Sequence, residues 1–253
     1  MAGGRADRPH GGGPAGLTVD VDESLRFLLP PRLRGRAPVV GIDADATLGH
    51  VVQSLGVPLT EVGALLLDGE PVPPQTRVAV PGRLAVPAVR RPQPAPTDPP
   101  RFLLDVHLGR LARRLRLLGL DVAYDNDAHD AELVARSLAE QRVLLTQDRG
   151  LLRRRALLHG AYVRGQHVDR QTDDVLDRFA PPLAPWSRCP ACGGLLEPVD
   201  RAAVEHRLEP GTRRTYDEFA RCTACGRPYW RGAHARRLEA AVARARGRRL
   251  WTT

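Results

Sequence analysis

The sequence predicts an α/β protein made of three parts: a small β-rich unit, a parallel sheet with helices on both faces, and a cysteine-bearing unit. Three observations lead to this prediction. A proline-rich stretch lies over residues 84–100, strand and helix patterns alternate between residues 101 and 180, and the four cysteines form two pairs after residue 186. A chain of 253 residues has room for two or three small domains.

Residues 1–15 are glycine-rich, and we expect them to be disordered. A compact unit follows over residues 16–86. Alternating apolar residues predict its first strand, a second apolar run predicts a hairpin partner, and an Asp-Gly pair marks a tight turn after the third strand. A helix capped by Asp45–Thr47 separates the two pairs of strands. The expected strands are residues 17–21, 39–43, 64–70 and 77–80, and the expected helix begins at Leu48 and runs through Leu55.

Six prolines occur in residues 84–100, and such a stretch sustains neither a helix nor a central strand. It predicts a semi-rigid spacer between two folded units. We therefore expect the first unit to end at residue 86, with a linker over residues 87–100. A second unit is expected over residues 101–183 and a third over residues 186–253.

Short apolar runs then alternate with segments of helical periodicity, and Gly119 closes the first of these helices. This alternation predicts a parallel sheet covered on both faces. The expected strands are residues 101–105, 121–125, 142–146 and 160–164. The expected helices are residues 108–118, 130–140, 151–158 and 172–179. We expect the arginines of the first helix to lie mostly away from its apolar face; they are Arg110, Arg113, Arg114 and Arg116.

The four cysteines are Cys189, Cys192, Cys222 and Cys225. Each pair has two intervening residues and is followed by glycine, and 29 residues separate the pairs. Two such knuckles can point four thiolates at one tetrahedral Zn²⁺, as in a structural zinc ribbon. Disulfides or thiols without a metal are the alternatives. Because a closed four-thiolate site normally supports folding rather than chemistry, the activity has to be sought upstream.

Acidic residues follow three of the expected parallel strands. Asp105 ends the first strand, Asp125, Asp127 and Asp130 follow the second, and Asp148 follows the third. Ligands of open parallel sheets bind beyond the carboxyl ends of the strands. Clustered carboxylates repel one another unless a cation lies among them, and oxygen ligands suit Mg²⁺ or Mn²⁺. Two such ions can activate a water and stabilise the leaving oxygen of a phosphodiester. The alternative is that these aspartates only cap the following helices.

Charge and composition limit the function further. All 38 basic residues are arginine, which excludes Schiff-base and Walker-lysine chemistry. The net charge is +9, and residues 186–253 supply +7 of it through 14 arginines against 7 acids. A basic end on a near-neutral body suggests docking to a polyanion, with a solvated arginine face as the alternative. No apolar run of about 18 residues and no secretory signal is present, so we expect a cytoplasmic protein without a membrane span.

The segments FLLDVHLGRLARRLRLLGLDVAYDNDAHDAEL and RVLLTQDRGLLRRR resemble the Mut-seven C-terminal RNase domain, a PIN-like nuclease family. The later segments RCPACGG and CTACGRPYWRGAH are similar to the zinc ribbon that commonly follows that domain. The resemblance implies a PIN-like fold, RNA as the partner, and Mg²⁺- or Mn²⁺-dependent cleavage through Asp105, Asp127, Asp130 and Asp148. The chain departs from the usual family pattern at His107, His129 and Gln147 but keeps all four aspartates.

Residues 16–86, with their LLDGEPV turn, resemble a β-grasp, ubiquitin-like domain, which often precedes this RNase domain. The sulfur carriers among such domains act through a free C-terminal diglycine. Here the corresponding end continues into VPAVRRP, so no acyl-adenylate can form there. The resemblance therefore implies an interaction module that binds a protein partner.

Two function hypotheses result. The first is a metal-dependent ribonuclease that hydrolyses RNA phosphodiester bonds, and the alternative is a non-catalytic adaptor that binds RNA or protein through a degenerate PIN-like domain. Several residues have two interpretations. His107, His129 and Arg153–Arg155 either contact substrate or are solvated, and Tyr229–Trp230 either stack on bases or pack over the zinc core. Residues 233–249 are expected to form a basic amphipathic helix. The sequence does not decide whether Asp125 or Asp169 adds a metal ligand.

Overall fold

The computed structural model describes residues 16–41, 45–77, 81–232, 239, 242 and 243. The chain divides into two compact units, Met1–Val89 and Arg90–Thr253, and each is described by itself. The predicted disorder of residues 1–15, three residues of the predicted strand 77–80, and most of the predicted C-terminal helix lie outside the described residues.

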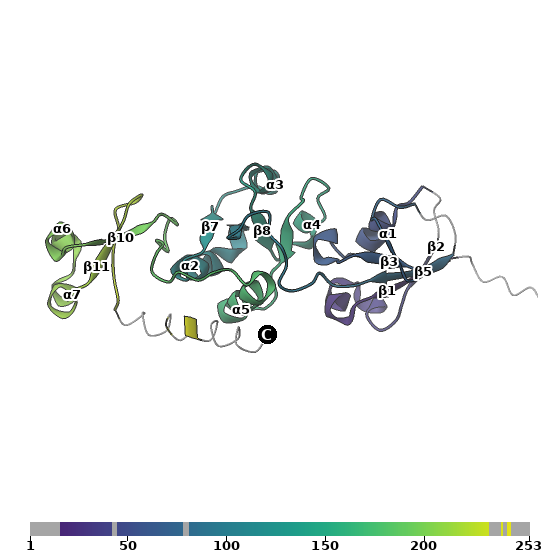
Figure 1. The fold of residues 1–253 in the computed structure, drawn as a ribbon, viewed down its shortest axis with the longest axis horizontal. Coiled ribbons are helices and arrows are strands. Elements are labelled where there is room, and N and C mark those ends of the chain that lie inside the picture. Colours follow the sequence, from purple (N-terminus) through teal and green to yellow (C-terminus); the bar gives the residue numbers. More distant parts are fainter. Residues whose placement is uncertain (1–15, 42–44, 78–80, 233–238, 240–241, 244–253) are drawn as a thin grey trace, which may run out of the picture. The chain divides into compact units, whose positions relative to one another are not determined.

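The first unit is a mixed sheet with one α-helix (Figure 1). Its strands are β1 (Gly16–Val21), β2 (Val39–Gly41), β3 (Leu65–Leu67), β4 (Glu70–Val72) and β5 (Gly82–Val86), in the spatial order β2-β1-β5-β3-β4. The helix α1 (Leu48–Ser54) begins after Thr47, whose side chain accepts a hydrogen bond from the backbone N–H of His50. Leu17, Val19 and Val21 alternate into the core. This is the β-grasp, ubiquitin-like arrangement that the sequence predicted.

The last strand of this unit differs from the prediction. The last described strand is β5 at residues 82–86, which the prediction lacked, and it is the central strand, parallel to β1 and antiparallel to β3. The proline-rich stretch 84–100 was expected to sustain no central strand, yet its first three residues belong to β5. Leu84 and Val86 are buried, and the first proline of the stretch, Pro87, comes only after the strand has ended. Arg77 forms an isolated antiparallel bridge with Thr47 instead.

The second unit contains a four-stranded, fully parallel sheet, as predicted, and the order of its strands is β7-β6-β8-β9. Its strands are β6 (Arg101–Leu104), β7 (Asp121–Tyr124), β8 (Val143–Thr146) and β9 (Gly160–Tyr162). The helices are α2 (Gly109–Leu117), α3 (Asp130–Ala139), α4 (Arg149–Leu152) and α5 (Val168–Phe179).

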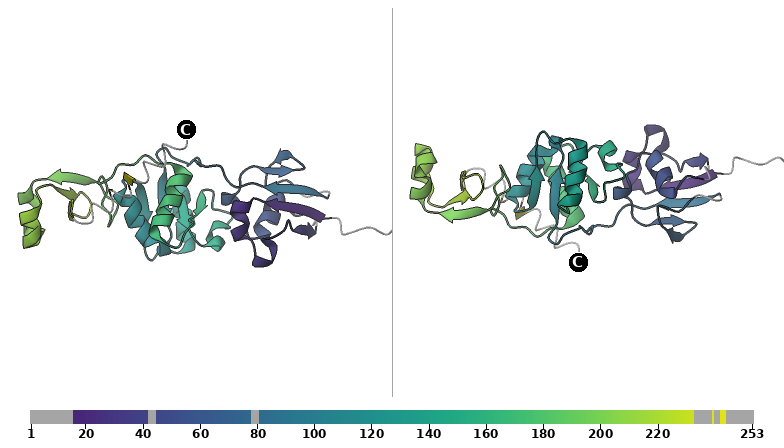
Figure 2. Two further views of the ribbon diagram at one scale, coloured as in Figure 1. Left: turned by 90° about the horizontal axis from the view of Figure 1, so that it is seen from below. Right: turned by 90° about the horizontal axis from the view of Figure 1, so that it is seen from above.

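Helices cover both faces of this sheet (Figure 1, Figure 2). Phe102 and Leu104 of β6 point to the face that α2 and α5 cover, and Leu103 between them points to the face that α3 and α4 cover. Neighbouring strand residues thus lie in two separate cores, because side chains alternate along a strand. Both cores are built mainly from leucine and valine, which explains how a chain with 4% aromatic residues folds.

Two predicted helices have different lengths in the structure. The helix expected at residues 151–158 ends at Leu152, and a turn closed by the N–H of Leu157 on the carbonyl of Arg154 leads into β9. The helix expected at residues 172–179 begins earlier, at Val168. Gly119 ends α2 as predicted: its φ is +87°, and a Cβ there would lie 1.9 Å from the carbonyl oxygen of Ala184.

The cysteine-bearing part of the second unit is a three-stranded antiparallel sheet, β10 (Leu196–Val199), β11 (Phe219–Cys222) and β12 (Pro228–Trp230), in that order. Two short helices, α6 (Arg201–Val204) and α7 (Pro210–Thr215), connect β10 to β11. Val204, Leu208 and Phe219 form a small core on which Trp230 packs. Packing is therefore observed for Trp230, on this apolar core, and stacking on bases stays a prediction.

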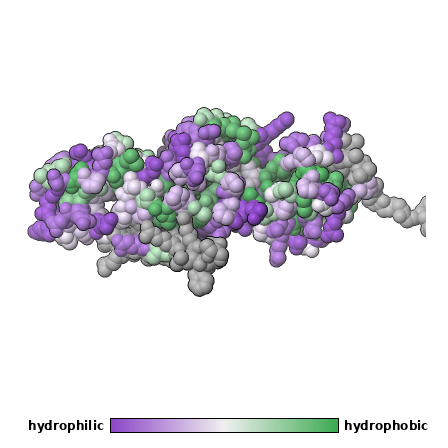
Figure 3. Space-filling model, viewed as in Figure 1, coloured by the Kyte–Doolittle hydropathy of each residue, from purple (hydrophilic) through white to green (hydrophobic). Residues whose placement is uncertain are grey.

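The described surface is largely hydrophilic on the face that Figure 3 shows. Four large apolar side chains are exposed among the described residues: Val39, Leu138, Leu158 and Leu195. Three arginines are nevertheless buried, namely Arg116, Arg142 and Arg178. Arg116 is buried, but Arg110 and Arg113 are exposed and Arg114 is half-buried, so the expectation that the arginines of α2 lie mostly away from its apolar face holds for three of the four.

Candidate functional site: a sulfur cluster and an acidic sheet edge

The four cysteine side chains converge as predicted. The Sγ atoms of Cys189 and Cys225 lie 3.7 Å apart, and those of Cys192 and Cys222 lie 3.5 Å apart. All four sulfurs lie within 4.8 Å of one another, and none of the four cysteines forms a disulfide. Four thiol groups at this separation fit a tetrahedral metal ion of the zinc type. The predicted alternative of disulfides was wrong.

Local backbone geometry builds each half of this cluster. In the first knuckle the N–H of Gly193 donates to the carbonyl of Cys189, and in the second the N–H of Gly226 donates to the carbonyl of Cys222, at 2.8 and 2.9 Å. Both glycines have positive φ, +83° and +69°, which favours glycine at these positions. A Cβ on Gly194 would lie 2.8 Å from the Cβ of Ala224, so a glycine there lets the two knuckles approach each other.

The thiols of Cys189 and Cys192 have different pKa values, because their hydrogen bonds differ. Burial raises the pKa of Cys189, but hydrogen bonds from the Tyr229 hydroxyl and from backbone N–H groups outweigh it and lower that pKa to about 6. The hydroxyl lies 3.1 Å from the sulfur. Burial and the neighbouring sulfurs raise the pKa of Cys192 to about 12. A bound cation would favour the thiolate form at all four positions.

Arg116 connects this cluster to the parallel sheet. Its Nε donates to the carbonyl of Val122 at 3.0 Å, and its Nη1 donates to the carbonyl of Ala191 at 2.8 Å, inside the first knuckle. The residue is 3% exposed, and burial lowers the pKa of its guanidinium. A second link joins Arg188 to Asp121 at 3.2 Å. The ribbon is thus attached to α2 and β7 by buried polar contacts.

Asp105 lies at the carboxyl end of β6, one residue beyond Leu104, whose partners in the sheet are Tyr124 and Leu145. Its side chain is buried, with the residue 5% exposed. One carboxylate oxygen accepts a hydrogen bond from the Thr146 hydroxyl at 2.6 Å, and the other accepts a long one from the backbone N–H of His107 at 3.4 Å. In the part of the chain that the structure describes, no basic side chain forms an ion pair with it.

Asp148 is connected to Asp105 through Thr146. The backbone N–H of Asp148 donates to the Thr146 hydroxyl at 2.9 Å, and that hydroxyl donates to Asp105. The Asp148 side chain also caps α4 by accepting from the N–H of Gly150 at 2.6 Å. Asp148 therefore caps α4 as the alternative predicted, and it uses one of its two carboxylate oxygens to do so.

The remaining acids lie in the loop after β7. Asp125 and Asp127 are exposed, and the Asp125 carboxylate accepts from the backbone N–H of Asp127 at 3.1 Å. Asp130 begins α3 and forms an ion pair of 2.9 Å with Arg154. Asp169, outside the predicted ligand set, pairs with Arg114 at 2.9 Å.

The structure brings the sulfurs together but not the carboxylates. Among the described residues, the cysteines are the one group of three or more histidine, cysteine or acid side chains whose ligand atoms lie within 4.8 Å of one another. Asp105 and Asp148 share Thr146, whereas Asp127 and Asp130 belong to a separate loop. The acidic edge is therefore an open arrangement of carboxylates.

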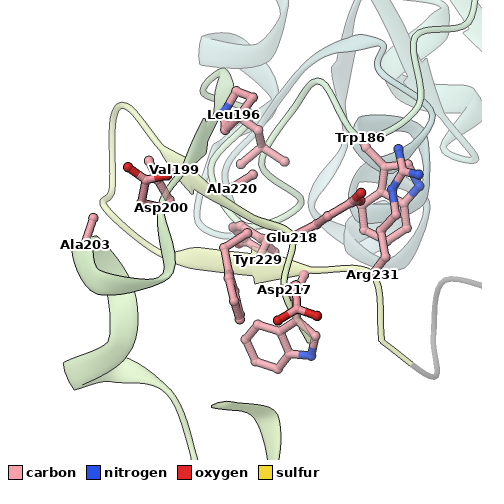
Figure 4. Close-up of a pocket in the computed structure, with 13 residues that line it drawn as sticks. Trp186, Leu196, Val199, Asp200, Ala203, Asp217, Glu218, Ala220, Tyr229 and Arg231 are labelled. Atoms are coloured by element: carbon pink, nitrogen blue, oxygen red, sulfur yellow. The ribbon is translucent and has the colours of Figure 1, made fainter. Parts of the chain in front are cut away.

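One pocket of the ribbon does not coincide with this edge. It has a volume of about 760 Å³ and lies over the three ribbon strands (Figure 4). Trp186, Tyr229 and Trp230 line it together with the carboxylates of Asp200, Asp217 and Glu218. Arg231 also lines the pocket, but the three carboxylates outnumber this guanidinium group, which disfavours a phosphate ligand. This pocket is therefore a poor candidate for the predicted docking of a polyanion.

Sequence reasoning missed two residues of these sites. Thr146 was read as the end of a strand, and Arg116 as a surface arginine of a helix. The signal for Thr146 was a hydroxyl at the last position of a strand that precedes an acid. No sequence pattern marks Arg116 as buried, because it follows Leu115 on a helix that carries three other arginines.

A parallel sheet with an acidic carboxyl edge, preceded by a β-grasp domain and followed by a four-cysteine ribbon, defines the class of protein: a multidomain α/β protein whose ribbon can hold a metal ion. The comparison with protein families agrees. The Mut7-C RNAse domain matches residues 100–242, more than half of the chain, and the Mut7-C ubiquitin domain matches residues 15–93. The chain belongs to the Mut7-C RNAse domain family.

The searches of curated proteins and of solved structures gave no match. In the described part of the chain, every helix is too short or too polar to cross a lipid bilayer.

Proposed function

We propose that this protein is a metal-dependent ribonuclease and that Asp105 is the central acid of its site. The observation that carries the proposal is the burial of this carboxylate without a basic partner among the described residues. A buried charge is costly unless it is paired or coordinates a metal. The proposed ligand atoms are all carboxylate oxygens, which fit Mg²⁺ or Mn²⁺ better than a softer ion.

The residues of the chain have separate tasks in this proposal. Asp105, Asp127, Asp130 and Asp148 would hold the ion, with Asp130 exchanging its exposed ion pair to Arg154 for this role. Thr146 fixes one oxygen of Asp105 and the backbone of Asp148 at the same time. When bound, a divalent ion supplies charge stabilisation to the phosphodiester and lowers the pKa of an attacking water.

The test is the substitution Asp105→Asn in the full chain. We expect cleavage of single-stranded RNA to fall at least about 100-fold, because removing one electrostatic stabiliser of a transition state typically costs that much. We expect the variant to lose Mn²⁺ binding at the sheet edge as well, as measured by calorimetry on zinc-loaded protein. RNA binding persists. Asp98→Asn is the matched control, since Asp98 is exposed in the same unit. Equal cleavage by Asp105→Asn and wild type would contradict the catalytic role of Asp105.

A second candidate is a non-catalytic adaptor that binds RNA or protein. It is favoured by the absence of any three described acids within 4.8 Å of one another and by the ion pair of Asp130. The manganese titration discriminates between the two. No binding at millimolar Mn²⁺ together with no cleavage supports the adaptor.

The cysteine cluster is assigned a structural Zn²⁺ in the same proposal. Four sulfurs leave no open position for substrate, so this ion would stabilise the ribbon and take no part in cleavage. Reduced thiols suit the cytoplasm, where we place the protein. The ubiquitin-like unit is assigned to binding a protein partner.

A further inference from the structure

A pocket of about 650 Å³ lies beside the acidic edge and has no role in the proposal above. One wall is the turn after β6 and the start of α2, and the other is the segment that leads into α5. The side chains that matter for its chemistry are His107, Arg110, Arg113, Gln166 and His167.

The lining of this pocket is cationic. Arg110 and Arg113 are three residues apart on α2 and therefore lie on one side of that helix. Both are exposed, and neither forms an ion pair with any described residue. The acid of the lining, Asp169, is bound by the adjacent Arg114 at 2.9 Å. Two uncompensated guanidinium groups and two imidazoles thus face one hollow.

Hydrogen bonds attach both walls to the residues that flank the proposed site. The backbone N–H of His107 donates to the Asp105 carboxylate. On the other side, the side-chain amide of Gln147, next to Asp148, donates to the carbonyls of Val163 and Gly165 at 2.9 and 2.8 Å. These bonds hold the segment that carries Gln166 and His167. Hydrogen bonds therefore connect both walls of the pocket to the acidic edge.

We propose that this pocket binds the phosphodiester backbone of the RNA strand next to the bond that is cut. Arg110 and Arg113 contact phosphate oxygens, and His107, Gln166 and His167 donate hydrogen bonds to phosphate or ribose. This inference rests on the proposed function and adds to it a position for the substrate. It assigns RNA contact to α2 rather than to Arg153–Arg155 or to the carboxylate-lined pocket of the ribbon.

The experiment measures binding apart from cleavage. A fluorescent single-stranded oligoribonucleotide is titrated with the full, zinc-loaded chain without added divalent metal, at several salt concentrations. The test variant is Arg110→Gln/Arg113→Gln, and the matched control is Arg32→Gln/Arg36→Gln, which removes two exposed arginines from the first unit.

For the test variant we expect at least a tenfold loss of affinity. The slope of log K against log salt is negative, and its magnitude should decrease by about 1.4, since each phosphate contact to a single strand contributes about 0.7. The control keeps the wild-type affinity and slope. An unchanged slope in the test variant, or a wild type that does not bind this RNA, overturns the inference.

The outcome for cleavage is read separately. Wild-type RNA binding that depends on Arg110 and Arg113, with no cleavage in Mn²⁺, supports the pocket and refutes the ribonuclease proposal. Cleavage that the test variant retains at wild-type kcat and KM refutes the pocket and leaves the ribonuclease proposal standing.

Discussion

The sulfur cluster and the acidic edge belong to the same unit, yet they are assembled in different ways. Each half of the sulfur cluster is closed by a hydrogen bond between residues four apart, from Gly193 to Cys189 and from Gly226 to Cys222. The acidic edge depends instead on the pairing of strands, since Thr146 and Asp105 are separated by 41 residues and meet only in the sheet. Local hydrogen bonds shape each half of the sulfur cluster, whereas the acidic edge forms only when the strands of the sheet pair.

This difference between the two sites indicates where a bound metal would stabilise the fold. In the ribbon the four thiols converge and few apolar residues are buried, so we expect metal binding and folding to be coupled. At the acidic edge two leucine-rich cores hold the sheet, and the carboxylates stay apart. We therefore expect the loss of the first metal to unfold its surroundings and the loss of the second to leave the fold intact.

The largest expected effect follows from removing one sulfur by Cys222→Ser. Zinc binding supplies about 10–16 kcal/mol in small zinc domains, far more than the ribbon core can replace. We expect the bound zinc to be lost and hydrogen-exchange protection to disappear in β10, β11 and β12, while β6 and β8 stay protected.

Thr223→Ser is the control for this change, because it alters an exposed neighbour and keeps a hydroxyl. A ribbon that stays fully protected without zinc would show that the two regions do not differ in their dependence on metal.

A smaller effect is expected from Arg116→Met, which removes one of the two links between the ribbon and the parallel sheet. The carbonyls of Val122 and Ala191 lose their donor inside the protein. Removing one partner of buried polar contacts costs about 3 kcal/mol. Urea unfolding followed by tryptophan fluorescence measures this, since Trp186 and Trp230 lie in the second unit. Arg113→Met, on the exposed side of the same helix, should stay within about 0.5 kcal/mol of wild type.

Thr146→Val tests the assembly of the acidic edge alone. The carboxylate of Asp105 loses its 2.6 Å hydrogen bond, and the N–H of Asp148 loses its acceptor. We expect a loss of about 1–3 kcal/mol in the free energy of unfolding, and a further loss of RNA cleavage. Thr146→Ser keeps the hydroxyl and should recover most of both. Full activity in the valine variant would contradict the role of Thr146 in placing the two acids.

The smallest effect concerns pH. Burial raises the pKa of Asp121, but hydrogen bonding and charge interactions with Arg142 and the charges of Arg188 and Arg101 outweigh it, so the pKa lies below its usual range. A depressed carboxyl pKa adds stability that is complete above the unfolded-state pKa and disappears as pH falls through the folded-state pKa. We expect Asp121→Asn to remove about 1 kcal/mol of stability at pH 7 and almost none at pH 2. Equal losses at the two pH values would contradict an electrostatic role.

Much of this architecture can be predicted from the sequence, because it depends on local patterns. The cysteine pairs, the four parallel strands and the capping of α1 and α4 all follow from neighbouring residues. The central strand β5 was missed because six prolines in residues 84–100 outweighed the alternation of Leu84 and Val86, and only pairing with β1 distinguishes the strand from the linker. Arg116, Thr146 and the pocket beside Asp105 were missed for the same reason: each depends on partners far away in the chain.

The parallel pairing of β1 with β5 also affects synthesis on the ribosome. The first strand of the chain, Gly16–Val21, has its interior neighbour at Gly82–Val86. During translation, residues 16–72 can emerge and still lack the strand that lies between β1 and β3. The ubiquitin-like unit can therefore close only after Val86 has left the exit tunnel, and a nascent chain halted before that point exposes an incomplete sheet.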